Sequence, residues 1–265
     1  MNGESIPNLV VYMFAYSVIG YVCETAYCSF GKKRFVDRGF LQGPYLPVYG
    51  LGALAVITLL DSIAHRPVLV FVLGALICSI VEFVTGWLLQ IIFHARLWDY
   101  SKHRFNLYGR VCLLNTTLFG LLALIAVTFI HPALRAILQN VSEQVLGYAA
   151  AGILIVFSID TSISVHKMVS FNTLLSRAKQ LKSEMEERID RLGEELRPLA
   201  RSYVEREFER LRLQLRNAGK RILDAFPNFS RIDFEAQLSQ VRASLNQWRE
   251  QKNVSRKKKK RTEEQ

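Results

Sequence analysis

Three acidic residues lie inside stretches that are otherwise apolar enough to be membrane helices: Glu24, Glu82 and Asp160. A carboxylate at the centre of a bilayer costs at least about 2.5 kcal/mol, so such acids usually face the interior of a helix bundle or a wet cavity. Acids in that position can line a polar cavity or act as acid–base groups. The three residues are therefore the first candidates for a functional site.

Five apolar stretches position these acids, and each is long enough to cross about 30 Å of hydrocarbon at about 1.5 Å per residue. They run over roughly residues 8–30, 46–64, 67–93, 109–130 and 146–166. The segment before the first stretch has no Lys or Arg, so that stretch is interpreted as a permanent helix and not as a signal peptide. We expect an all-α fold with a polytopic membrane helix bundle of about five transmembrane helices over residues 1–166.

Basic residues are concentrated on alternate loops of this bundle. The loops after the first and third stretches each hold four Lys and Arg residues, whereas the segments on the other side hold at most one. By the positive-inside rule the N-terminus lies outside and the C-terminal region is cytoplasmic. The prediction is a multi-pass protein of the plasma membrane, in contact with membrane lipid.

With this orientation the three acids lie about 7 to 12 residues from the cytoplasmic ends of their spans, or roughly 10 to 18 Å. We therefore predict that they line one polar cavity that opens toward the cytoplasm. The cytoplasmic loops supply the polar candidates for its mouth: Arg38, Asp99, Asn106 and Arg110.

The first of these loops, RGFLQGPYLPVYG over residues 38–50, has a composition that forbids a regular helix. It favours a tight or re-entrant path into the second span. The residues expected to shape it are Gly39, Gly43, Pro44, Pro47 and Gly50.

The C-terminal part of the chain differs from the first 166 residues in charge and pattern. Residues 1–166 carry 10 Lys and Arg against 8 Asp and Glu, and the remainder carries 24 against 15. Apolar residues from Leu174 to Tyr203 recur every three or four positions, which is typical of a coiled coil or helical hairpin. We expect a cytoplasmic helical region over 167–251, a homodimer or helical partner bound through 170–251, and a basic disordered tail over 252–265.

Familiar catalytic and metal-binding patterns do not occur in the sequence. It contains no GxxxxGK[ST], GxSxG or HExxH, so an ATP-driven role requires a separate ATPase subunit, and the chain by itself is not expected to be an enzyme. Its four cysteines form no CxxC pair, so no metal and no cofactor are expected. Nucleic acid is not an expected partner, because the basic residues accompany no recognition fold.

Two loop motifs, RGFLQGPYLPVYG and WDYSKHRFNLYGR, together with YVCETAYCS before them, resemble a known family of bacterial membrane proteins. This is the family labelled putative ABC transporter permease, also called CmpB-like or type IV, and the resemblance covers roughly residues 10–165. It implies a transporter without a catalytic or substrate assignment. The residues that match its motif positions are Glu24, Arg38, Gly39, Gly43, Pro44, Pro47, Tyr49, Gly50, Glu82, Gly86, Trp98, Asp99, Tyr100, Asn106, Gly109 and Arg110.

Three functions are compatible with these features. The leading hypothesis is a transporter permease component with a polar, cytoplasm-facing cavity and an unspecified substrate. The first alternative is an enzyme that processes lipid or phosphate groups at the inner leaflet, with arginines binding phosphate and acids exchanging protons. The second is a membrane-anchored scaffold that binds a partner through its cytoplasmic helices.

Overall fold

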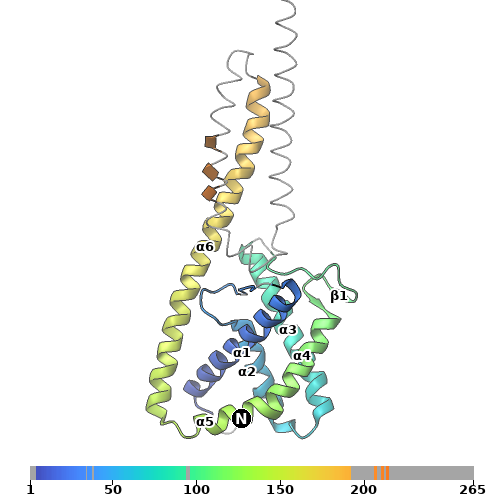
Figure 1. Ribbon diagram of the computed structural model, residues 1–265, viewed down its shortest axis with the longest axis vertical. Coiled ribbons are helices and arrows are strands. Elements are labelled where there is room, and N and C mark those ends of the chain that lie inside the picture. The colour runs from blue at the N-terminus through green and yellow to red at the C-terminus, as the bar shows by residue number, and fades with distance from the viewer. Residues whose placement is uncertain are drawn as a thin grey trace, which may run out of the picture.

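The structure is a computed structural model that describes residues 4–33, 35–37, 39–93, 96–191 and six positions between 206 and 214 (Figure 1). The regular secondary structure of these residues is helical apart from one short antiparallel hairpin, in which Asn106 pairs with Cys112 and Leu107 with Val111. The elements are α1 (Ile6–Lys32), α2 (Pro47–Leu60), η1 (Asp61–Ile63), α3 (Pro67–Phe93), β1 (Asn106–Leu107), β2 (Val111–Cys112), α4 (Leu113–Ile125), η2 (Ala126–Ile130), α5 (His131–Leu138) and α6 (Glu143–Arg191).

Within the described residues, four helical segments are long and apolar enough to cross a membrane. They are Ile6–Phe30, Pro67–Phe93, Leu113–Leu138 and Glu143–Leu174. Their outer faces are apolar yet exposed; on α3 these faces include Val68, Val72, Leu76, Ile80, Val84, Leu88 and Ile91. Exposed apolar surface of this extent is what a lipid-facing helix requires. The chain is therefore a multi-pass membrane protein.

The segment expected to be the second span differs from the prediction in length. It forms a shorter apolar helix, Pro47–Ile63, whose α-helical part rises only about 21 Å. Residues 39–46 precede it as an irregular loop in which Gly39, Leu41 and Tyr45 are buried. Pro47 begins the helix because its missing N–H is not needed in the first turn. The loop therefore packs against the bundle ahead of α2, with Pro44 exposed.

Glycines allow the helices of the bundle to approach each other closely. A Cβ at Gly50, which lies within α2 and not in the preceding loop, would overlap Ser17 Oγ and the backbone oxygen of Met13 on α1. A Cβ at Gly74 on α3 would overlap the Cβ of Ala123 on α4. Small residues at helix crossings are the usual device for close packing in membranes, where apolar side chains gain little by leaving lipid.

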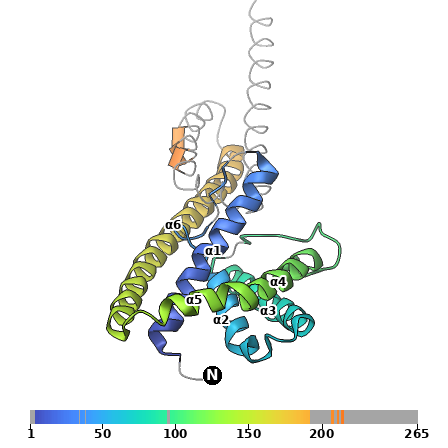
Figure 2. The same cartoon turned by 60° about the horizontal axis from the view of Figure 1, so that its bottom comes forward.

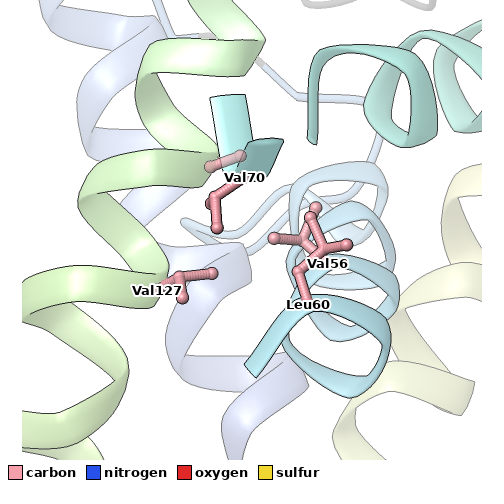
Figure 3. Packing of buried hydrophobic residues seen from close by; sticks show 5 residues of the cluster. Val56, Leu60, Val70 and Val127 are labelled. Carbon is pink, nitrogen blue, oxygen red and sulfur yellow. The ribbon is translucent and has the colours of Figure 1, made fainter. Parts of the chain in front are cut away.

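The central core lies where α2, α3 and the α4–η2 segment meet (Figure 3). Val56 and Leu60 from α2 pack against Val70 from α3 and Val127 from η2. The π-helical turn η2 precedes Pro132, which lacks a backbone donor and crowds the carbonyl one turn earlier. Proline thus accounts for the change of helix type at this point.

The long helix α6 stands beside α1 (Figure 2) and continues past the other labelled helices in the view of Figure 1. Phe157 of α6 packs against Phe14 and Tyr45, and Asn172 Nδ2 donates to the backbone oxygen of Phe93 at 2.7 Å. The helix is continuous across residue 166, where the sequence pattern changes, and reaches Arg191 without a break. The expected tail at 252–265 and the expected helical region from residue 192 to 251, apart from six positions between 206 and 214, lie outside the described residues.

Candidate functional site: a cavity between α1, α2, α3 and α4

A cavity of about 180 Å³ lies between α1, α2, α3 and the α4–η2 segment. Its walls are mainly apolar and include Ile19, Val56, Val81, Leu122, Ala123 and Ala126. Five of the side chains that line it carry a hydroxyl or carboxyl group: Tyr16, Glu24, Tyr49, Glu82 and Tyr100. The cavity therefore combines an apolar interior with two carboxyl groups that lie within candidate membrane spans.

The first carboxyl group, Glu24 on α1, is held by a tyrosine from α2. The hydroxyl of Tyr49 donates to Glu24 Oε2 at 2.8 Å, and Cys28 Sγ lies 3.5 Å from Oε1. Gly20 lies one turn before Glu24, and a Cβ there would overlap the Tyr49 side chain. The glycine thus allows Tyr49 to lie against α1 and reach the acid.

The second carboxyl group, Glu82 on α3, is 7% exposed and is met by a tyrosine from the loop after α3. The Tyr100 hydroxyl donates to Glu82 Oε1 at 3.3 Å, and Asn115 of α4 also faces this carboxyl. Burial and then the charge of Glu82 raise the pKa of Tyr100 above its ordinary value of 10.0, so the hydroxyl stays protonated and can donate. Oε2 of Glu82 has no hydrogen-bond partner among the described residues.

The loop that carries Tyr100 is shaped by two of the predicted site residues. Asp99 accepts bonds from the backbone N–H and the hydroxyl of Ser101, and these bonds lower the pKa of Asp99. Asn106 donates to the backbone oxygen of His103 at 2.8 Å and accepts from the N–H of Gly109 at 3.0 Å. Asp99 and Asn106 therefore position the loop, which brings Tyr100 and Trp98 to the cavity.

Replacing Gly109 with Ala is expected to destabilise this loop by about 1–2 kcal/mol, the cost of a left-handed backbone for a residue with a Cβ. Gly109 has φ +71°, and a Cβ would lie 2.7 Å from Asp99 Oδ1. The measurement is thermal unfolding of the purified chain in detergent. Gly147→Ala is the control, because nothing lies within 4 Å of a Cβ there. Equal unfolding temperatures for the two variants would contradict the expectation.

Arg110 lies at the end of the same loop, against α3. Its guanidinium donates to Gln90 Oε1 at 2.9 Å and stacks over the Phe83 ring at 5.3 Å. Its backbone oxygen accepts a bond from Trp98 Nε1 at 3.1 Å, and the Trp98 ring borders the cavity next to Gly86. Arg110 thus connects the loop to α3 and helps to hold Trp98 in the cavity wall.

The third predicted acid, Asp160 on α6, has a different role in the structure. It accepts bonds from the backbone N–H groups of Gln42 at 2.7 Å and Gly43 at 2.8 Å, and from the Tyr45 hydroxyl at 2.5 Å. Ser164 adds a fourth bond at 3.2 Å. The structure therefore brings Glu24 and Glu82 to one cavity and uses Asp160 to hold the loop before α2. Arg38 lies outside the described residues.

Sequence reasoning did not identify the hydroxyl partners of the two cavity acids. Tyr49 and Tyr100 belong to the loop motifs, but their pairing with Glu24 and Glu82 is not visible in the spacing. Tyr16, whose hydroxyl is buried at the cavity without a partner among the described residues, also gave no signal. The available clue was general: a buried acid needs hydrogen-bond donors, and the two loop motifs contain tyrosines, although these lie 25 and 18 residues from the acids that they bond.

The fold and the cavity define a multi-pass helical membrane protein with an acidic, apolar-walled cavity inside its helix bundle. The chain belongs to the family described as Putative ABC-transporter type IV, which matches residues 11–165. The resemblance drawn from the loop motifs is thereby confirmed, and the matched range contains every residue that lines the cavity. No curated protein and no solved structure matches the chain.

Proposed function

We propose that the chain is the membrane-spanning subunit of an ABC-type transporter and that the cavity between α1, α2, α3 and α4 holds the substrate during passage. The observation that carries this proposal is the pair of carboxyl groups, Glu24 and Glu82, on one cavity within the bundle. Membership of the family supports the transporter class. The sequence has no P-loop, so ATP hydrolysis falls to a separate subunit.

The proposed topology has five passages, with α2 and the loop over 39–46 together forming the second. The bonds from Leu46 N to Ser17 O at 2.9 Å and from this loop to Asp160 support that path. The N-terminus is outside, and the basic loops after α1 and α3, with Arg38 and Arg110, face the cytoplasm. Asp99 and Asn106 shape the cytoplasmic rim, and residues 167–251 form a cytoplasmic helical region available to a partner.

Glu82→Gln is expected to abolish activity while the protein still inserts and folds, because it removes the ionisable carboxyl group and keeps the side-chain volume. The assay is rescue of cells from which the gene has been deleted, with membrane levels matched by immunoblotting. Glu24→Gln should lose activity in the same way. Glu143→Gln, at the exposed start of α6, is the matched control and should rescue fully.

Two results would count against this function. Full rescue by the Glu82→Gln variant would show that the cavity acid is not needed. If deletion of residues 192–265 then abolished rescue in the same assay, the hypothesis of a membrane-anchored scaffold would replace that of a transporter. Purification of the wild type in a mild detergent should also yield a P-loop ATPase in stoichiometric amount, identified by mass spectrometry. Its absence from preparations in which the chain is folded would contradict the transporter assignment.

A further inference from the structure

We propose that the ligand of the cavity is a compact organic cation, an amine or quaternary ammonium group with an apolar body, whose nitrogen lies between Glu24 and Glu82. This inference rests on the proposed use of the cavity as the substrate site. It specifies the chemical class of the ligand from the charge, the unpartnered atoms and the walls of the cavity.

The cavity is lined by acidic side chains and, among the described residues, by no basic ones. Glu24 and Glu82 are the two ionisable acids on its lining, and no Lys, Arg or His is among the described residues that line it. The nearest arginine of the adjoining loop, Arg110, donates to Gln90 and stacks over Phe83. Because a carboxylate in a membrane interior is costly unless it is paired, two such groups favour a ligand that supplies positive charge.

Two polar atoms at the cavity are buried and lack a hydrogen-bond partner among the described residues: Glu82 Oε2 and the Tyr16 hydroxyl. The two residues are 7% and 4% exposed, respectively, and both line the cavity. Buried polar groups in folded proteins are almost always bonded, so these atoms are candidates for contacts with a ligand. A carboxylate oxygen attracts an ammonium group directly, and the Tyr16 hydroxyl can accept from an N–H donor.

The walls of the cavity suit the apolar body of such a cation. Aromatic side chains border it from several elements: Tyr16, Tyr49, Trp98, Tyr100 and Phe119. The rings of Tyr49 and Phe119 meet edge to face, with centroids 6.4 Å apart. Aromatic rings attract organic cations through their negative faces and also bury apolar groups.

A bare metal ion fits these features less well than an organic cation. Hard divalent cations prefer about six or more oxygen ligands, and no cluster of three metal-ligating side chains occurs in the described part of the chain. The cavity volume of about 180 Å³ also exceeds the space of a single ion and leaves mainly apolar walls around it. An organic cation accounts for both the acids and the walls.

The experiment measures binding of three probes of similar ring size to the full chain in lipid nanodiscs by isothermal titration calorimetry. The probes are benzylammonium, benzyl alcohol and benzoate. The cation should bind at least about tenfold more tightly than the other two, a difference of about 1.4 kcal/mol. Glu82→Gln and Glu24→Gln should each weaken cation binding by at least about tenfold, whereas Glu143→Gln should bind like the wild type.

Because the comparison of the three probes uses the wild type, it remains decisive if the Glu82→Gln variant does not fold. Equal affinity for cation and alcohol, tighter binding of benzoate, or unchanged cation binding by a folded Glu24→Gln variant would overturn the proposal. Cation preference without any ATPase partner would support the cation site and count against the transporter. A stoichiometric ATPase and loss of rescue in Glu82→Gln, without cation preference, would keep the transporter and overturn the cation site.

Discussion

Replacing Asp160 with Asn is expected to destabilise the folded protein by about 3 kcal/mol, because hydrogen bonds to a buried carboxylate contribute about 1.5–3 kcal/mol each. The carboxylate accepts from the backbone N–H groups of Gln42 and Gly43 and from the Tyr45 hydroxyl. An asparagine side chain offers only one oxygen, and its NH₂ group would face donors of the loop. At least one buried donor would therefore lose its partner.

The measurement is thermal unfolding of the purified full chain in detergent, combined with limited proteolysis. The variant should unfold at a clearly lower temperature and become cleavable within residues 39–46. Tyr45→Phe is the comparison; it removes only one of these bonds and should cost about 1.5 kcal/mol, the lower end of that range. If Asp160→Asn unfolds like the wild type and its loop remains resistant to protease, Asp160 does not hold the loop.

Replacing Gly50 with Val is expected to destabilise the folded protein by about 3 kcal/mol or more and to lower the yield of folded protein. Overpacking typically costs about 1–3 kcal/mol, and more where the neighbouring atoms cannot move. A Cβ at Gly50 overlaps Ser17 Oγ and the backbone oxygen of Met13, so α1 and α2 would have to separate. That separation would also withdraw Tyr49 from Glu24 and disturb the cavity. The measurements are the monodisperse fraction in size-exclusion chromatography and the unfolding temperature.

The matched control is Gly152→Val on α6, where nothing lies within 4 Å of an added Cβ. This variant should retain the yield and the unfolding temperature of the wild type. Equal losses from both substitutions would show that the close crossing of α1 and α2 is not the reason for the effect at Gly50.

The lengths and order of the helices could largely be predicted from the sequence, because an apolar run of more than about 20 residues has few other uses. The second span was the exception. Its apolar run over 46–64 suggested a full span, but Pro47 sets the start of the helix, and the residues before it pack against the bundle. Whether an irregular segment packs against a bundle depends on its partners, here Ser17 and Asp160, which are distant in the sequence.

The depth of the three acids could be estimated from the sequence, since each helical residue advances by about 1.5 Å, but the direction of each side chain could not. Direction depends on which helices are neighbours. Glu24 and Glu82 face the same cavity, whereas Asp160 faces a loop whose N–H donor lies 118 residues away in the chain. The turn-forming character of Asp99 and Asn106 is a local property and could have been recognised as such.

The continuity of α6 has a mechanical consequence. The helix is fixed to the loop before α2 at Asp160, and Gly39 and Leu46, at the ends of that loop, border the cavity. The helix is held again at Asn172, which donates to the backbone oxygen of Phe93, and Arg191 lies 19 residues beyond that point on the same unbroken helix, or about 28 Å away. A tilt of α6 by about 10° at Asn172 would displace Arg191 by about 5 Å, so a small movement of the helix within the bundle becomes larger at its far end.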